Sequence, residues 1–231
     1  MTGWEGLYCG PAPVPEEIWL RWNLDPWAIA VIAGLALLAG KNRPGLAAIL
    51  VLAVAFLSPL CALSSALFSA RVLHHVLLVA VAAPLLALAR PSRSDTGTGL
   101  PFLAATAALW LWHLPVAYDA ALSDMAIYWV MQASLLGSAF LFWRAVFRHP
   151  AGEGLVWVFL GYLGMGMLGA ILTLAPEGLY ATHASAPLLW GMTPLADQQL
   201  GGLVMWMPAG LPYAVWGGML ARRAWRGMGA A

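Results

Sequence analysis

The sequence predicts an all-α, polytopic membrane protein: a seven-transmembrane-helix bundle with its N-terminus outside and its C-terminus in the cytoplasm. Three observations predict this fold class. Of the 231 residues, 62% are hydrophobic and only 9% are charged, whereas roughly a quarter of the residues of a soluble domain are charged. The apolar residues gather in stretches long enough to cross a bilayer, which takes about 20 residues. Thirteen tryptophans suit a protein with two water–lipid interfaces, where indole rings accumulate.

Composition and motifs exclude several function classes. The formal net charge of +1 leaves no basic footprint for a nucleic-acid partner. The chain has no phosphate-binding loop, no dinucleotide-binding glycine motif and no nucleophile elbow of the G-x-S-x-G type. A retinal protein needs a Schiff-base lysine, and the single lysine, Lys41, lies in a predicted loop. We therefore expect a protein that is not an enzyme and whose surroundings are the lipid bilayer.

Seven apolar stretches divide the chain into three parts. Residues 1–24 form an extracytoplasmic segment, which three prolines make extended or turn-like, residues 25–221 form the membrane domain, and residues 222–231 form a cytoplasmic tail. The expected spans lie near residues 25–40, 44–60, 71–90, 101–117, 125–143, 155–175 and 199–221. Pro208 and Pro212 should kink the last span, because proline removes a backbone donor. The glycines between Gly161 and Gly169 should let helices approach closely.

Positive charge sets the orientation of a membrane protein, because cytoplasmic loops are enriched in Lys and Arg. With the N-terminus outside, nine of the eleven cations are cytoplasmic and only Arg21 and Arg71 are external. Eight of the ten acidic residues are then external, and only Asp95 and Glu153 are inside. The bias of nine to two decides the orientation given above.

Histidines gather near the outer face of the predicted bundle. His74 and His75 lie in the first two turns of the third span, and His113 reaches a similar depth in the fourth. Imidazole binds copper, zinc and haem iron, and a thioether such as that of Met131 suits Cu(I). The alternative for each histidine is an ordinary interfacial hydrogen bond, and a helical methionine more often only packs. Arg71 could extend its charge to the outer interface.

Two further features near the outer face leave alternatives open. Asp197, Gln198 and Gln199 begin the last span, where Asp is favoured by the helix dipole, so this run is either a helix start or part of a site. Cys9 and Cys61 are both external, where a disulfide is chemically possible. Two free thiols or a metal site are equally compatible with the sequence.

Four stretches carry a resemblance to a known family. They read LFSARVLHHVLLVAVAAPLLAL (67–88), WLWHLPVAYDAAL (110–122), GMLGAILTLAPEGLY (166–180) and PLADQQLGGLVMWMPAGLPY (194–213). In this order and spacing they resemble the polytopic, seven-span cytochrome c oxidase assembly factors of the CtaG type, which are distinct from the single-span copper chaperone of the same name. The likeness covers nearly the whole chain and marks it as a divergent member.

The resemblance implies a bacterial inner-membrane protein that serves the biogenesis of a haem–copper terminal oxidase. It also implies which residues belong to the family motifs, and two of these motifs are altered here. The family pattern has two histidines four residues apart in the third span, where this chain has Arg71 and His75, and a run of histidines and a glutamate in the fifth span, where it has Tyr128, Met131 and Gln132. The histidine of W-H-L-P and the D-Q-Q motif are kept. A guanidinium cannot bind metal, so the copper site should be modified or lost.

Three functions follow, all without catalysis. The leading expectation is an assembly or accessory factor that acts on oxidase subunits, with copper insertion at the outer face and His75, His113, His74 and Met131 as the copper ligands. The first alternative is a stably bound accessory subunit with a degenerate metal site, in which Arg71 pairs with Asp119, Asp124 or Asp197. The second is a small haem or copper carrier with His75 and His113 as axial ligands.

Overall fold

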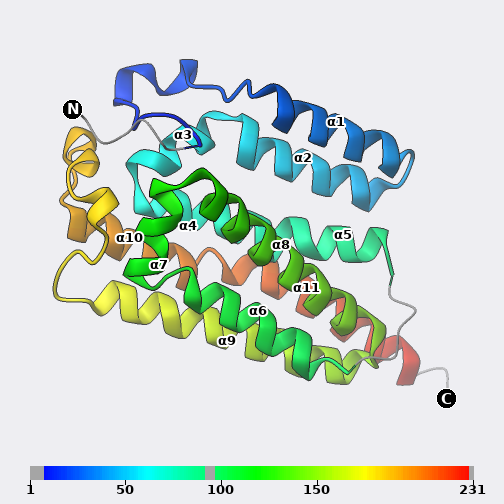
Figure 1. Cartoon of the computed structure of the whole chain (residues 1–231). Coiled ribbons are helices and arrows are strands. Elements are labelled where there is room, and N and C mark those ends of the chain that lie inside the picture. Colours follow the sequence, from blue (N-terminus) through cyan, green and yellow to red (C-terminus); the bar gives the residue numbers. More distant parts are fainter. Residues whose placement is uncertain (1–7, 92–96, 229–231) are drawn as a thin grey trace.

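The computed structural model describes residues 8–91 and 97–228, and its described residues form helices and connecting turns without a strand (Figure 1). Glu5, Arg93 and Asp95, which entered the charge count, lie outside this part. In chain order the helices are η1 (Pro15–Leu20), α1 (Pro26–Ala39), α2 (Arg43–Leu57), α3 (Pro59–Ala66), α4 (Phe68–Val76), η2 (Leu77–Ala82), α5 (Ala83–Ala89), α6 (Gly99–Leu111), α7 (Pro115–Ser123), α8 (Met125–Arg148), α9 (Ala151–Leu174), η3 (Ala181–His183), η4 (Ala186–Trp190), α10 (Pro194–Trp206) and α11 (Gly210–Met228).

The all-helical, multi-pass character that the sequence predicts is confirmed. Four helical stretches are long and apolar enough to cross a membrane: 68–89, 125–148, 151–174 and 194–228. Two bent pairs, α2 with α3 and α6 with α7, raise the number to as many as six, and α1 is a shorter apolar helix. The count of seven crossings therefore depends on whether α1 and both bent pairs cross, and it stays a prediction.

Proline bends two of the expected spans. α2 ends at Leu57 and α3 begins at Pro59 with a bend of 49° between them, and α6 is followed after Leu111 by α7 at 76°. The expected fourth span, 101–117, is therefore divided between two helices. Pro115 is the first residue of α7, and Leu114 before it has an extended backbone (ψ 129°), because a residue that precedes proline is disfavoured in the helical region.

The third expected span runs from Phe68 to Ala89, with a wide π-helical segment, η2, in its middle. Pro84 follows this segment and has no N–H, so the carbonyls four and five residues before it lose their helical donor. Two indole N–H groups replace that donor: Trp143 donates to Val79 O at 2.8 Å and Trp216 to Ala80 O at 2.9 Å. The two tryptophans thus satisfy buried carbonyls that Pro84 leaves open.

The last stretch, α10 and α11, is interrupted at Met207–Ala209, as Pro208 predicts. Its start packs against α9 at very short range: a methyl group on Gly202 would lie 2.5 Å from the carbonyl oxygen of Gly169. Only a residue without Cβ allows this approach. Of the glycines between 161 and 169, Gly169 therefore confirms the close packing that the sequence predicts for this segment.

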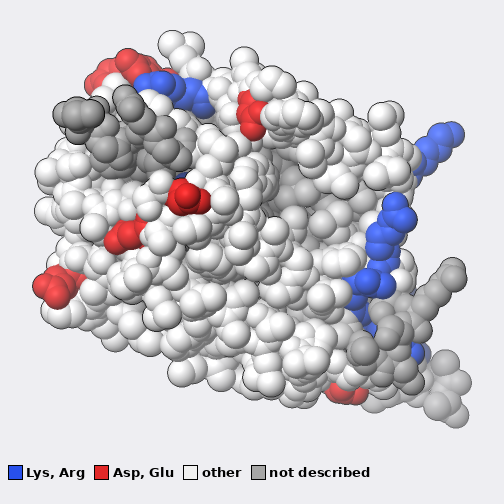
Figure 2. Space-filling view, in the orientation of Figure 1, with Lys and Arg blue, Asp and Glu red and all other residues white. Residues whose placement is uncertain are grey.

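The long helices run side by side, so that the molecule has two ends (Figure 1). One end holds η1, α3, α7 and the loop with η3 and η4, and the other holds the α1–α2 turn and the last turns of α11. Acidic residues gather over the first end and Lys and Arg over the second (Figure 2). We call them the acidic end and the basic end.

Candidate functional site

Near the acidic end of the bundle, helix α4 buries three polar side chains. Arg71 is 1% exposed, His74 0% and His75 1%. Residues three and four positions apart share a helix face, so both imidazoles lie one turn from the guanidinium. Burial is expensive for polar side chains unless they are hydrogen-bonded. α4 therefore concentrates groups that require partners from the surrounding helices.

His113 approaches this group from the break between α6 and α7. Its ring centroid lies 5.6 Å from that of His75, and the ring of His75 lies 6.0 Å from that of His74. Nδ1 of His113 lies 2.7 Å from the carbonyl oxygen of Leu109, so this nitrogen carries the proton and donates. Nε2 of His113 then has a lone pair directed away from its own helix.

Helix α8 covers the other side of α4 with three buried residues, Tyr128, Met131 and Gln132. The guanidinium carbon of Arg71 lies 5.4 Å from the ring centroid of Tyr128, within the range of a cation–π contact. The structure therefore brings Arg71 of the third expected span against Tyr128 of the fifth, two of the positions at which the sequence indicates altered family motifs. We call Arg71, His74, His75, His113, Tyr128, Met131 and Gln132 the polar cluster.

Many polar atoms of the polar cluster have no hydrogen-bond partner among the described residues. They are both ring nitrogens of His74 and His75, Nε2 of His113, both amide atoms of Gln132, and Nε and Nη1 of Arg71. Folded proteins satisfy the great majority of buried polar groups. Such a concentration in one place distinguishes the polar cluster from the remaining buried polar residues and indicates a site that serves function.

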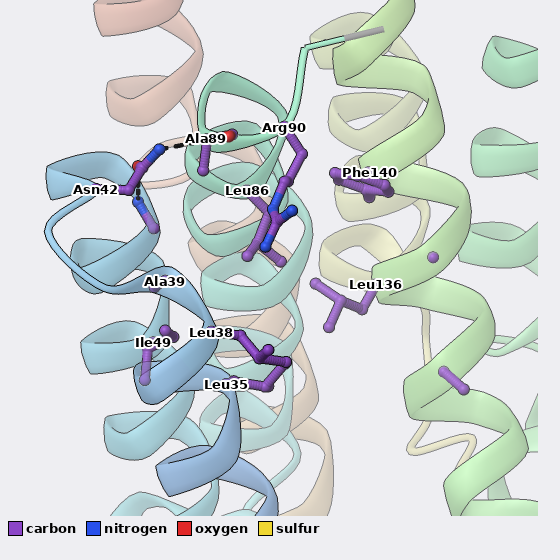
Figure 3. A pocket seen from close by; sticks show the side chains of 13 residues that line it. Leu35, Leu38, Ala39, Asn42, Ile49, Leu86, Ala89, Arg90, Leu136 and Phe140 are labelled. Carbon is purple, nitrogen blue, oxygen red and sulfur yellow. Dashed lines mark hydrogen bonds between the residues drawn. The ribbon is translucent and has the colours of Figure 1, made fainter.

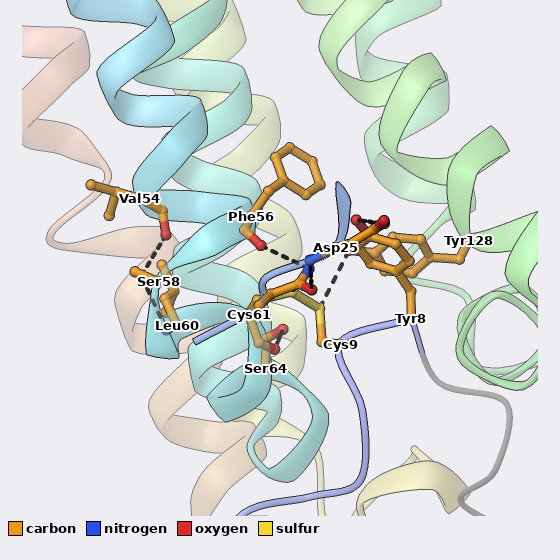
Figure 4. The surroundings of a disulfide bond; sticks show 11 residues. Tyr8, Cys9, Asp25, Val54, Phe56, Ser58, Leu60, Cys61, Ser64 and Tyr128 are labelled. Carbon is orange, nitrogen blue, oxygen red and sulfur yellow. Dashed lines mark hydrogen bonds between the residues drawn. A yellow bond between two sulfur atoms is a disulfide. The ribbon is translucent and has the colours of Figure 1, made fainter. Parts of the chain in front are cut away.

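The N-terminal segment packs against Tyr128 of the polar cluster (Figure 4). The structure joins Cys9 and Cys61 in a disulfide, with their Cα atoms 5.3 Å apart, which decides between the alternatives that the sequence left open. The disulfide holds Tyr8 against α8, where its ring stacks on Tyr128 at 5.1 Å. The hydroxyl of Tyr8 donates to Asp25 at 2.7 Å, and burial, followed by this bond, raises the pKa of Tyr8.

The D-Q-Q run has a structural role in which Asp197 caps helix α4. Its carboxylate accepts the backbone N–H of Phe68 at 2.6 Å and that of Ser69 at 3.1 Å, as well as the Ser69 hydroxyl at 2.5 Å. Gln198 accepts from the N–H of Leu179 and donates to the carbonyls of Leu172 and Glu177. Gln199 is half-buried. Asp197 and Gln198 therefore position α4 and the loop after α9 rather than enter the polar cluster.

The expected pairing of Arg71 with an acidic residue is wrong. Asp119 accepts the N–H groups of Ala181 and Thr182, Asp124 caps α8 at Ile127, and Asp197 caps α4. All these residues lie in the described part of the chain, and no ion pair joins any of the three carboxylates to Arg71. The counterpart of the cation there is the ring of Tyr128.

Sequence reasoning missed an aromatic group beside the polar cluster. The ring of Phe68 stacks on that of Tyr180 at 4.3 Å, and the Tyr180 hydroxyl donates to His113 O at 2.8 Å. His183, a loop residue in the sequence, is 2% exposed and lies 2.7 Å from the Tyr118 hydroxyl and 3.2 Å from Ala66 O. Burial lowers the pKa of His183 to about 4. Only the fold of the 175–193 loop could have revealed this.

Within residues 8–91 and 97–228, no group of three or more His, Cys, Asp or Glu side chains is arranged to hold a metal ion. The pair of His75 and His113 remains as the candidate donor set, with one imidazole nitrogen of each ring available. Neutral imidazole suits Cu(I), whereas Arg71 one turn away adds a permanent positive charge. The site therefore fits a weakly bound monovalent ion better than a divalent one.

The family of the chain follows from comparison with known proteins. The model of the cytochrome c oxidase caa3 assembly factor family (Caa3_CtaG) matches residues 46–95 and 99–227. The chain belongs to this family. The match includes the polar cluster and begins after α1, so the family relation extends over α4, α6 and α8, which build the site. No curated protein and no solved structure matches the chain.

Membership confirms the family that the sequence motifs indicated and supports a role in oxidase assembly. Together with the apolar helices, it describes a membrane protein associated with cytochrome c oxidase biogenesis. Arg71 and Tyr128 contact each other in the interior of this caa3 assembly factor.

Proposed function

We propose that this caa3 assembly factor acts without catalysis on subunits of a bacterial haem–copper oxidase, and that it presents Cu(I) to them at the outer face of the inner membrane through His75 and His113. The observation that carries the proposal is the pair of buried imidazoles, 5.6 Å apart between ring centroids, with unpartnered nitrogens. Two neutral nitrogen donors in an apolar surrounding suit Cu(I). Met131 is a buried, polarisable thioether on the adjacent α8.

Arg71 shapes this proposed site. Its guanidinium is permanently charged and cannot act as a ligand, and it lies one turn from both histidines of α4. The charge weakens the binding of a cation, which suits a protein that passes its ion on rather than stores it. The contact with Tyr128 holds the guanidinium on the α8 side of α4.

Arg71 also favours the first alternative, a stable oxidase subunit with a degenerate metal site. If Arg71 and Tyr128 have replaced metal ligands to build a structural contact, the fold would serve binding alone. The haem alternative has less support, because the rings of His75 and His113 are in edge-to-face contact and a porphyrin would have to separate them. None of the five cavities described for this structure is lined by either ring.

The proposal includes seven membrane crossings with the acidic end outside. α1 and each bent pair count as one crossing, which adds three to the four long helices. The segment before α1 and the end of α11 lie at opposite ends of the bundle (Figure 1), as an odd number of crossings requires. Lys and Arg gather at the basic end (Figure 2), and this positive charge supports a cytoplasmic position for that end.

Binding of Cu(I) to the purified full-length protein tests the copper role. We expect one ion to bind the wild type and binding to be lost when His75 and His113 are both replaced by Ala. The control is His149→Ala, which removes a histidine that pairs with Glu153 outside the polar cluster. Unchanged stoichiometry in the double variant would exclude this site. A Soret band in the purified protein would favour the haem carrier instead.

Co-purification separates the assembly factor from the accessory subunit. A tagged chain should recover oxidase subunits from cells in which assembly is in progress, and mature active oxidase should lack the chain. Near-equal amounts of the chain in mature oxidase would contradict the transient role and support the subunit.

A further inference from the structure

A long apolar groove runs between α1 and α8. Two cavities of about 610 and 490 Å³ lie next to each other along it, with Leu35, Ala133 and Leu136 in the walls of both. Helix α2 contributes Ile49 and Leu52 to its floor. In Figure 3, Leu35 and Leu38 of α1 face Leu136 and Phe140 of α8 across the opening. The groove exists because α1 packs against α2 and stands apart from α8.

The groove faces the hydrocarbon of the bilayer. Leu38 is 72% exposed and Leu35 37%, and α1 is apolar on every side, as expected for a helix in lipid. α1 has 14 residues and is about 21 Å long at roughly 1.5 Å per residue, whereas one leaflet contributes about 15 Å of hydrocarbon. The groove is therefore long enough for an acyl chain that enters from either leaflet.

One end of the groove carries a positive charge. Arg90 ends helix α5, is exposed and lines the groove beside Asn42, which donates to Ala89 O (Figure 3). Lys41 and Arg43 flank Asn42 in the α1–α2 turn. No acidic residue lines this end of the groove. An apolar slot that ends at an arginine matches a ligand with an acyl chain and a negatively charged head group.

We propose that this groove binds an anionic phospholipid, with an acyl chain between α1 and α8 and its phosphate at Arg90. The lipid fills the gap beside α1 and so links this helix to the remainder of the bundle. Binding does not depend on the proposed copper role. With the proposed orientation, Arg90 lies in the cytoplasmic leaflet, and only this assignment of the head group rests on the proposed function.

Native mass spectrometry of the full-length protein in detergent tests the proposal, with phosphatidylglycerol and phosphatidylcholine of identical acyl chains as probes. Arg90→Gln should weaken phosphatidylglycerol binding about fivefold, the effect of one cation near an anionic lipid, and should weaken phosphatidylcholine binding less, because the choline cation offsets the charge of the phosphate. Arg222→Gln is the matched control, because it removes one exposed charge at the same end of the molecule outside the groove. Equal losses in the two variants would overturn the site at Arg90.

A second pair of variants tests the groove itself. Gly137 lines it, and a Cβ there meets no atom within 4 Å, so Gly137→Leu fills the space without a clash. It should weaken the binding of both lipids. Gly218→Leu, at an exposed position of α11 outside the groove and equally free of contacts, should not. Unchanged phosphatidylglycerol binding in Gly137→Leu would overturn the proposal. If lipid binding is unchanged in this variant but co-purification with oxidase subunits is lost, the groove receives a helix of a partner instead.

Discussion

Single residues near the acidic end differ in whether their polar atoms are satisfied. Asp197, Gln198 and His183 each bond to backbone groups of other segments, so their burial is compensated. His75, His113 and Gln132 are equally buried and keep unpartnered atoms. This difference separates residues that hold the fold from residues available to a ligand, and sequence motifs alone group them together.

The pH dependence of stability should report on His183. Its pKa is lowered to about 4 by burial, below the unfolded value near 6.5, so the unfolded state binds more protons between these values. Its contribution to stability is complete above about pH 6.5 and is lost as the pH falls towards 4. We expect the thermal midpoint to fall more between pH 7.5 and 5 in the wild type than in His183→Gln. Parallel decreases would contradict a buried neutral His183.

Asp197 should be required for the stability of helix α4. Asp197→Ala leaves two buried N–H groups, those of Phe68 and Ser69, without an acceptor, which costs on the order of 1–3 kcal/mol for each unsatisfied group. Asp197→Asn keeps one acceptor oxygen, so its stability should lie between those of the wild type and Asp197→Ala. Gln199→Ala is the control, since Gln199 is half-buried on the same helix. Thermal unfolding in detergent measures all three, and a normal midpoint in Asp197→Ala would refute the capping role.

At the scale of helices, prolines create the irregularities that shape the site. Pro115 turns α7 away from α6 by 76° and leaves His113 at the break, where its ring reaches His75. Pro84 widens the helix that follows α4 and exposes the carbonyls of Val79 and Ala80 to Trp143 and Trp216. A straight helix at either place would not give this arrangement.

Trp143→Phe should destabilise the bundle by removing the donor to Val79 O. A buried unsatisfied carbonyl costs about 1–3 kcal/mol, which should lower the thermal midpoint. Pro84→Ala restores a backbone N–H in this turn, and we expect it to recover part of the loss in the double variant. Trp157→Phe is the control, because the indole of Trp157 is half-buried and donates to Glu153 in a solvent-exposed hydrogen bond. Additive losses without rescue would show that Trp143 acts by packing alone.

At the scale of the whole molecule, the separation of charge between the two ends predicts its sidedness. Ser185→Cys places a thiol in the exposed part of the 175–193 loop, and Gly227→Cys places one at the exposed end of α11. Cys9 and Cys61 are joined and leave no free thiol among the described residues. On intact spheroplasts, a membrane-impermeant maleimide should label Ser185→Cys, and Gly227→Cys only after lysis. The reverse order of labelling would invert the proposed orientation.

Much of the architecture was predictable from local patterns. Hydropathy placed an expected span on each apolar helical stretch, with ends that differ by up to seven residues, because apolar length is a property of consecutive residues. The distribution of Lys and Arg along the sequence likewise predicted that His74, His75 and His113 lie towards the same end of the bundle. The broken fourth span was missed although Pro115 was visible, since proline alone does not distinguish a kink from a 76° turn.

The sequence by itself determined that this is a helical membrane protein of the caa3 assembly factor family, with histidines, Arg71 and the D-Q-Q run gathered towards one end. The tertiary structure decided which of them meet. Arg71 lies on Tyr128 rather than on a carboxylate, His113 on His75, and Asp197 on the start of α4. The physical reason is that hydropathy specifies where a helix lies along the chain, whereas its rotation and neighbours depend on close packing at positions such as Gly202 and on hydrogen bonds between segments more than a hundred residues apart.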